Sequence, residues 1–488
     1  MVSLMLANFM VFSFFLFIFR ASNLMPFCYN DNEASNMIRM VLDSQKISDN
    51  SHAKNHTKVA PHENPNYSTH VQERTQLKHI VFGIGASSKL WDRRKEYIKI
   101  WWRPEEMRGF AWLDQPVDEE DYDRRSLPEV KISGDTSEFP YKHASGARSG
   151  LRISRIVSEI VRLGLDDVRW IVMGDDDTFF VADNLVRVLS KYDHTKFYYI
   201  GSTTESHTQN LHFSYHMAYG GGGFAISYPL AKELEKMQDR CIHRYPTMYG
   251  SDDRMHACMS ELGVPLTKEV GFHQMDIFGN PMGLLSAHPV APLVSLHHLD
   301  VMNPIFPNVD QAHALKRLTM PMRLDSAALM QQSICYDKAR NWTISNSWGY
   351  TAHIYRGLIR AIDMEMPTRT FLDWYRGGDG RGLIFNTRHP GRNSCERPSV
   401  FVLSNAVFNS ATNRTASEYV VSNSETKCGW KMDYDPSTLY RVEVHKKPDP
   451  NLWDKPPRRN CCTVLSTKKE GTVAIDVHEC AEGETIEI

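Results

Sequence analysis

Apolar runs alternate with amphipathic stretches along the middle of the chain, and this alternation predicts strands and helices in turn. Residues 79–84 and 170–173 are almost entirely apolar, as expected of strands that are covered by helices on both faces. Residues 90–102 and 151–163 carry apolar side chains at helical spacing, and a further helix is expected over 183–192. Strands that alternate with helices predict an α/β domain with a mostly parallel mixed sheet.

The pattern changes near residue 331. Short β-prone runs such as 399–408 and 439–447 follow, together with most of the cysteines, and they predict a β-rich module that disulfides brace. Some of its aromatic residues either stack on sugar rings or belong to the core; they are Trp342, Trp348, Trp374 and Trp453. We therefore divide the chain into an N-terminal apolar segment 1–20, a polar stem 21–76, an α/β domain 77–330 and a β-rich domain 331–488.

The N-terminal segment is apolar and free of charge from Met1 to Phe19. It is either a cleaved signal peptide or a short membrane anchor, and we favour the anchor because no clear cleavage motif follows. Four triplets for N-glycosylation occur along the chain, at Asn55, Asn66, Asn341 and Asn413. These features predict a single-pass type II membrane protein whose body faces the lumen of the secretory pathway.

Charge and cysteine content narrow the class further. Lys and Arg number 56 against 58 Asp and Glu, so there is no basic field to attract nucleic acid. Of nine cysteines, Cys28 lies beside the apolar segment, and the remaining eight form an even set that suggests disulfides, with buried free thiols as the alternative. We expect Cys241 to pair with Cys258, whereas the adjacent Cys461 and Cys462 should bond to different partners.

The most informative stretch is the acidic triplet Asp175-Asp176-Asp177 at the end of the apolar strand 170–173. Ligands bind beyond the carboxyl ends of strands in α/β sheets. Adjacent carboxylates repel one another unless a cation relieves them, and such oxygen clusters suit Mg²⁺ or Mn²⁺. A solvated turn or a helix N-cap is the alternative, but Asp183 offers a separate start for the next helix.

Two further segments carry candidate chemistry. The glycines 220–223 allow a close approach of the backbone to a ligand, although a flexible turn is an equal alternative. Ser251 is expected to be the N-cap of a helix that places Asp252 and Asp253 in its first turn and ends before Gly263. These carboxylates either stabilise the helix dipole or accept a proton in catalysis.

The order of these landmarks resembles that of the Fringe-type inverting β1,3-glycosyltransferases. The resemblance rests on W-I-V-x-x-D-D-D-T-F-F, the glycines before G-F-A-I-S, the Asp-Asp helix and V-S-L-H-H-L-D. It is closest to plant Fringe-like proteins, which share SICYDKARNWTISNSWGY, EMPTRTFLDWYR and PDPNLWDKPPRRNCC in a region of unknown function. The resemblance implies a GT-A nucleotide-sugar-binding fold, a UDP-sugar donor and Mn²⁺ or Mg²⁺ as cofactor.

The resemblance also assigns roles residue by residue. It implies that Asp175 and Asp177 flank the metal and that His297, in V-S-L-H, is a third ligand. His273 is a weaker candidate, because the His-x-His segment of true Fringe enzymes is incomplete here. The second acid of the Asp-Asp helix, Asp253, is the implied catalytic base, and its neighbour competes for that role.

Donor binding is expected to involve Asp175, Asp176, Gly222, Gly223 and Arg93. A guanidinium binds phosphate bidentately, although Arg93 and Arg94 could equally form a solvated helix face. The predicted activity is metal-dependent, inverting transfer from a UDP-sugar to a hydroxyl of a glycan or glycoprotein, in the Golgi membrane with a luminal catalytic domain. The alternative is an inactive carbohydrate-binding or scaffolding relative.

Overall fold

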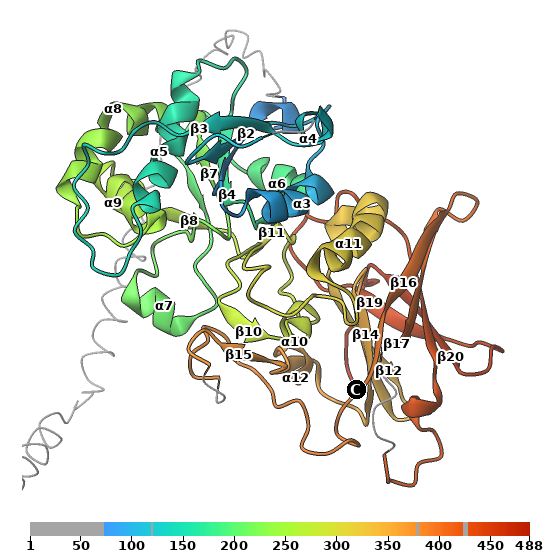
Figure 1. Ribbon diagram of the computed structural model, residues 1–488. Coiled ribbons are helices and arrows are strands. Elements are labelled where there is room, and N and C mark those ends of the chain that lie inside the picture. Colours follow the sequence, from blue (N-terminus) through green and yellow to red (C-terminus); the bar gives the residue numbers. More distant parts are fainter. Residues whose placement is uncertain (1–72, 119–120, 377–379, 423–427) are drawn as a thin grey trace, which may run out of the picture. The chain divides into compact units, whose positions relative to one another are not determined.

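The computed structural model describes residues 73–118, 121–376, 380–422 and 428–488, coloured along the sequence in Figure 1. The residues from Glu73 to Ile488 form one compact unit. The predicted anchor 1–20 and most of the stem 21–76 lie outside the described residues. Within the described part of the chain, no helix has both the length and the apolar character that a bilayer crossing requires.

A seven-stranded sheet forms the first half of the unit, with the acidic triplet at the end of its middle strand, β4. In spatial order its strands are β3 (Glu129–Ile132), β2 (Arg108–Leu113), β1 (Ile80–Gly85), β4 (Trp170–Asp175), β7 (Phe224–Ser227), β6 (Tyr199–Gly201) and β8 (Leu266–Lys268). Only β7 runs antiparallel to its two neighbours. The predicted mostly parallel mixed sheet is confirmed.

Helices cover both faces of this sheet, because alternate side chains of β4 point in opposite directions. Trp170 and Val172 join one apolar cluster with residues of α3 and α6, whereas Ile171 and Met173 join another with residues of α5, α8 and α9 (Figure 1). The helices are α3 (Trp91–Trp101), α4 (Asp121–Ser126), α5 (Ser149–Arg162), α6 (Ala182–Leu189), α7 (His207–His212), α8 (Tyr228–Arg244) and α9 (Ser251–Glu261). The helix expected to reach Tyr192 therefore ends three residues earlier.

An eight-stranded sheet forms the second half, as the β-prone pattern predicts. Its order is β12 (Gln332–Asp337), β13 (Trp342–Ser347), β14 (Thr351–Arg356), β16 (Ser399–Asn409), β17 (Arg414–Val421), β18 (Arg441–Lys446), β20 (Thr472–His478) and β19 (Cys461–Leu465). The helix α11 (Gln311–Asp325) lies between the two sheets in sequence, and its Leu315 and Leu318 share one core cluster with Phe82 and Phe401. The predicted boundary at residue 330 falls just before β12, but it stays a prediction because the core is continuous.

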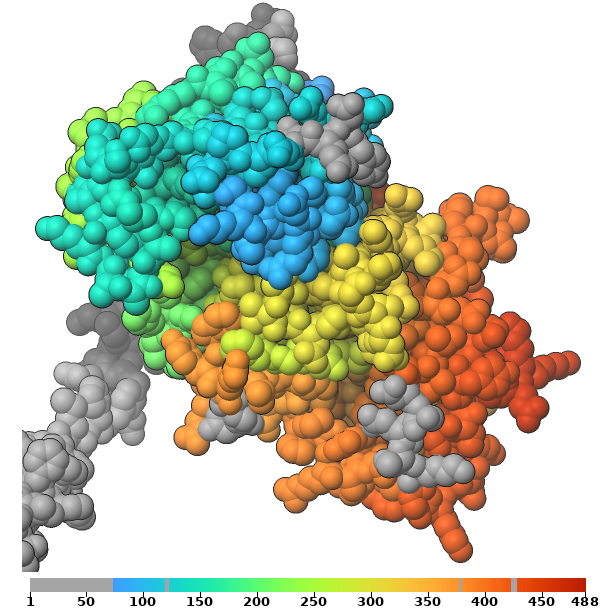
Figure 2. All heavy atoms as spheres, viewed as in Figure 1, coloured from blue at the N-terminus to red at the C-terminus, as the bar shows by residue number. Residues whose placement is uncertain are grey.

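One segment of the second half returns to the first. The strand β15 (Phe371–Asp373) pairs antiparallel with β10 (Ile277–Gly279), and the backbone N–H of Ile384 donates to the carbonyl of Glu205 at 3.0 Å. Figure 2 shows this part of the second half, in orange, packed against the yellow-green surface of the residues that precede α11. The β-rich half is therefore attached to the elements that lie beside the acidic triplet.

Disulfides join the predicted cysteines. Cys241 and Cys258 link α8 to α9, as expected from their spacing. Cys461 pairs with Cys480, whereas the adjacent Cys462 pairs with Cys335, so the two neighbours have different partners, as predicted. The remaining bond joins Cys395 to Cys428. All eight cysteines of the expected set are paired.

Candidate active site

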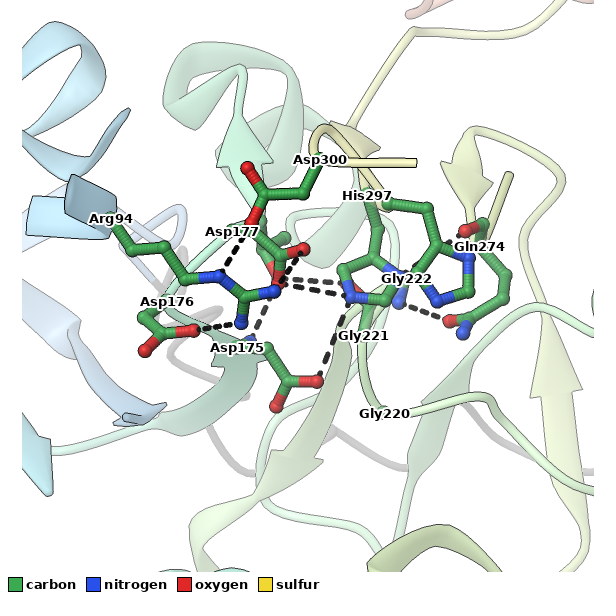
Figure 3. Close-up of polar contacts among 12 residues, drawn as sticks. Arg94, Asp175, Asp176, Asp177, Gly220, Gly221, Gly222, Gln274, His297 and Asp300 are labelled. Carbon is green, nitrogen blue, oxygen red and sulfur yellow. Dashed lines mark hydrogen bonds and ion pairs between the residues drawn. The ribbon is translucent and has the colours of Figure 1, made fainter. Parts of the chain in front are cut away.

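The acidic triplet meets a histidine from a distant part of the sequence. A three-stranded sheet, formed by β5 (Phe179–Phe180), β11 (Ser295–Leu296) and β9 (Phe272–His273), places His297 directly beside the triplet. Its Nε2 lies 3.2 Å from Oδ1 of Asp177 and 3.7 Å from Oδ2 of Asp175 (Figure 3). One ligand atom from each of the three residues lies within 4.8 Å of the others, close enough for one ion.

Burial and charge differ among these three side chains. Asp177 and His297 are buried, whereas 33% of the Asp175 side chain is exposed, so the cluster is open on that side. Desolvation, helped by Asp177 and opposed by His297, raises the pKa of Asp175 to about 7. Burial alone would lower the pKa of His297, but Asp177 and Asp175 raise it to about 9. Protonated His297 thus compensates two carboxylates that would otherwise repel each other.

The orientation of His297 is fixed by the loop that follows β9. Its Nδ1 donates to the carbonyl of Gln274 at 3.2 Å, which leaves Nε2 directed at the carboxylates. Oε1 of Gln274 in turn accepts from the backbone N–H of Gly222 at 2.7 Å. Such outer hydrogen bonds select the nitrogen that a histidine presents to a metal.

The glycine cluster allows close packing around this histidine. A Cβ added to Gly221 would lie 2.1 Å from Cε1 of His297, and one added to Gly222 would lie 3.0 Å from the backbone nitrogen of Gln274. Of the four glycines 220–223, only Gly223 has a positive φ, of +83°. The glycines are therefore needed for packing against protein atoms, while the expected contact of Gly222 and Gly223 with a donor stays a prediction.

A half-buried arginine connects the triplet to the segment after β11. Arg94 of α3 lies 2.6 Å from Asp176, 3.2 Å from Asp177 and 2.9 Å from Asp300. Burial alone would lower the pKa of Arg94, but Asp177 and Asp176 raise it. Arg93, which the sequence favoured as the donor contact, is 61% exposed at its side chain and contacts only the rim of this cluster, at Asp300.

Asp176 is turned away from the other two acids. Besides its ion pair with Arg94, its Oδ2 accepts from the backbone N–H of Ser87 at 3.1 Å. Its place in the donor site stays a prediction, and in this structure it connects β4 to the loop after β1. Asp300, the last residue of V-S-L-H-H-L-D, was missed by sequence reasoning, although its position three residues after His297 could have identified it.

The helix α9 begins one residue earlier than expected. Its N-cap is Gly250 rather than Ser251, so the predicted cap is wrong. Ser251 is instead the first residue of the helix, and its hydroxyl donates to Oδ1 of Asp252 at 2.8 Å. The carboxylate of Asp253 accepts from the N–H groups of Tyr249 at 2.6 Å and Gly250 at 3.0 Å. Asp253 thus has a structural role at the helix start, as the dipole-stabilising alternative proposed.

Its neighbour Asp252 faces the three candidate metal ligands Asp175, Asp177 and His297, which we call the metal cluster. A carboxylate oxygen of Asp252 accepts from the backbone N–H of Gly220 at 3.0 Å, and its negative charge contributes to the raised pKa of Asp175. Desolvation raises the pKa of Asp252 itself, against the hydrogen bond from Gly220. A half-buried carboxylate with a raised pKa, close to a metal site, is a candidate general base.

His273 lies near the cluster but faces the opposite way. Its Nδ1 is 2.9 Å from Oε1 of Glu205 and its Nε2 is 2.9 Å from Nε2 of His288. Both ring nitrogens are therefore engaged within the protein, and among the described residues His273 is not one of the three ligand candidates that converge.

The sequence matches two known family models and resembles known glucosyltransferases. Residues 75–332 match the family model described as Fringe-like, and residues 209–462 match one described as a protein of unknown function, DUF604. A human β-1,3-glucosyltransferase is 29% identical over 131 residues, which are 27% of this chain and 25% of that protein. The mouse β-1,3-glucosyltransferase is 30% identical over 148 residues, which are 30% and 29% of the two chains. The chain thus spans less than a third of the length of these relatives.

Among solved structures, mouse xyloside xylosyltransferase 1 in its apo form covers 38% of this chain and 81% of its own. The identity is 9% and the TM-score 0.24, which is too low to support an argument. The Fringe-like match alone extends over more than half of the 488 residues. On that match, the protein belongs to the Fringe-like family.

Proposed function

We propose that the protein transfers a sugar from a UDP-sugar to a hydroxyl of a glycan or glycoprotein acceptor, with inversion and with a divalent metal ion. The observation that carries this proposal is the meeting of Asp175, Asp177 and His297 at the end of the central strand, open on the Asp175 side. Family membership supports the transferase class. The UDP-sugar donor, the metal ion and the inversion of stereochemistry are part of the proposal, and the experiment below tests the donor and the metal.

The three side chains fit Mn²⁺ or Mg²⁺ in type and spacing. Two ligand atoms that each lie about 2.1 Å from one ion are at most roughly 4.2 Å apart. Nε2 of His297 meets this limit, since it lies 3.2 Å from Oδ1 of Asp177 and 3.7 Å from Oδ2 of Asp175. Carboxylate oxygens together with one imidazole suit Mn²⁺. When bound, such an ion offsets the charge of the leaving diphosphate. Asp175, Asp177 and His297 would hold it and leave positions for phosphate oxygens.

A carboxylate near this cluster would accept the proton of the acceptor hydroxyl as that hydroxyl attacks the anomeric carbon. Family resemblance implies Asp253, but three backbone N–H groups, those of Tyr249, Gly250 and Arg254, already engage its oxygens. Asp252 borders Gly220 and influences Asp175. We therefore rank Asp252 first and Asp253 second as the proton acceptor.

The deciding experiment uses purified protein, a panel of UDP-sugars and Mn²⁺-dependent release of UDP. Asp175→Ala and Asp177→Ala should weaken the binding of Mn²⁺·UDP, measured by calorimetry, as well as turnover. Asp252→Asn should keep Mn²⁺·UDP affinity near the wild-type value and slow transfer by about 10² to 10⁴. An exposed carboxylate on the turn after α6, in Asp193→Ala, is the matched control.

Each outcome has a definite meaning. If Asp253→Asn slows transfer while Asp252→Asn does not, the implied base is right and our ranking is wrong. If wild-type protein binds Mn²⁺·UDP yet releases no UDP from any donor, the proposed transferase activity is wrong. That result would favour the alternative function, an inactive carbohydrate-binding relative.

The same proposal includes a place in the cell. All eight cysteines in the described residues are joined in disulfides, which persist in oxidising compartments. We propose a luminal catalytic unit in the Golgi, held to the membrane by the apolar segment 1–20. Immunofluorescence with a Golgi marker, compared for the full chain and for one without residues 1–20, tests this placement.

A further inference from the structure

The described residues 366–376 and 380–388, which lie within the region of unknown function, border the candidate active site. Their strand β15 pairs with β10, which follows the loop that orients His297. Further along, Leu383 forms an isolated bridge with Ser206, and the backbone N–H of His207 donates to the carbonyl of Gly382 at 2.7 Å. These contacts attach the segment to β10 and to the start of α7.

An aromatic stack extends from the metal cluster into this segment. Trp374 stacks on Phe278, with ring centroids 5.0 Å apart, and on His298, with centroids 4.7 Å apart. His298 lies next to His297, and their ring centroids are 4.2 Å apart. The segment thus brings Trp374 within two rings of the candidate metal ligand.

A hollow of about 610 Å³ lies along the same segment. It is lined by residues 380–387 on one side and by His207 and Tyr215 on the other. Its side chains include the amide of Asn386 and the hydroxyl of Thr387. Ligand sites typically enclose about 300 to 1,000 Å³ and combine apolar surfaces with a few polar groups.

We propose that this hollow, with Tyr215 in its lining, holds a neutral pyranose ring of the acceptor glycan. A pyranose offers an apolar C–H face for stacking on Tyr215 and hydroxyls for Asn386 and Thr387. The proposal rests on the proposed function, because it assigns the acceptor to this side of the metal cluster. It gives the region of unknown function a direct part in choosing the substrate.

The other three tryptophans that the sequence left open between core and sugar stacking do not compete for this role. Trp342 and Trp348 are buried, and the indole N–H of Trp453 donates to the carbonyl of Ala327 at 2.9 Å. Of the four tryptophans that the sequence left open between core and sugar stacking, only Trp374 belongs to the stack beside the site.

The test uses the full chain and a panel of neutral disaccharides: lactose, cellobiose, N-acetyllactosamine, chitobiose and xylobiose. Saturation-transfer NMR should detect at least one of them with wild-type protein. Tyr215→Ala and Asn386→Ala change two residues that line the hollow and should each weaken that binding by about tenfold. Trp430→Ala removes a 54% exposed aromatic outside the hollow and should leave binding unchanged.

Two results would overturn the proposal: no disaccharide of the panel binds the wild type, or Tyr215→Ala and Asn386→Ala both bind like the wild type. Calorimetry with Mn²⁺·UDP on the same samples separates this from the proposed function. Wild-type protein that binds a disaccharide but not Mn²⁺·UDP would refute the donor site and leave the saccharide site standing. The reverse pattern would refute the saccharide site alone.

Discussion

Replacement of Gly221 by alanine should damage the metal site through one added carbon. That Cβ would lie 2.1 Å from Cε1 of His297 and 2.4 Å from both ring nitrogens. Ordinary contact between carbon atoms begins at about 3.5 Å, so the ring must move by about 1.4 Å. Metal–ligand distances tolerate only about 0.2 Å. Because Gly221 does not have a positive φ, alanine adds this clash without backbone strain.

The expected result is a selective loss of metal binding. Removal of an outer partner of a metal ligand typically costs about 10- to 100-fold in affinity, and displacement of the ligand itself should cost at least as much. Overpacking should also lower the free energy of unfolding by about 1 to 3 kcal/mol. Electron paramagnetic resonance of free Mn²⁺, in the presence of UDP, measures the affinity, and chemical denaturation measures the stability.

Gly220→Ala is the matched control within the same cluster. Its added Cβ would lie 2.7 Å from Oδ1 of Asp252, at the flexible end of a side chain, and outside the metal ligands. We expect Mn²⁺·UDP affinity near the wild-type value and slower transfer. Gly221→Ala protein that is folded and binds Mn²⁺·UDP within about threefold of wild type would refute the steric reasoning.

Three further predictions follow from the charges and surfaces described above. Because His297, with its pKa raised to about 9, must lose a proton to bind a metal, Mn²⁺ affinity should rise by about tenfold per pH unit between pH 7 and 8.5; calorimetry that shows a constant affinity contradicts this. Arg94→Met leaves buried carboxylates unpaired and should lower the free energy of unfolding by about 3 kcal/mol, against under about 1 kcal/mol for exposed Arg93→Met, measured by urea denaturation. Asn341 and Asn413 are exposed in turns and should carry glycans in secretory cells, so glycosidase treatment that leaves the gel mobility unchanged would refute luminal exposure.

The first sheet and its covering helices could be predicted from the sequence because their signals are local. A fully apolar run such as 170–173 requires cover on both faces, and helical spacing is visible within 12 residues or so. The cysteine spacing was similarly sufficient for Cys241 and Cys258, since two helices joined by a short connection keep their ends close. The candidate metal residues came from the acidic triplet and, for His297, from family resemblance.

Contacts between distant segments could not be predicted in this way. Arg94 and Asp300 are 206 positions apart, and nothing local in either segment indicates that one guanidinium bridges three carboxylates. The sequence was equally insufficient to decide whether Asp252 or Asp253 faces the candidate metal ligands. Adjacent residues at a helix start point in different directions, and the direction depends on whether the cap is Gly250 or Ser251. One residue of register decides which carboxylate faces the metal cluster.

The pairing of β15 with β10 has the broadest consequence, because it connects the two halves of the chain at the site. Glu205 shows how: its carbonyl accepts from Ile384 of the second half, while its carboxylate accepts from the backbone N–H of Met275 and contacts His273. The residue between these last two, Gln274, orients His297. The support of the metal ligand is therefore shared with a segment beyond the Fringe-like match, which ends at residue 332. A boundary at residue 330 describes the sequence pattern, but the chemistry of the site depends on both sides of it.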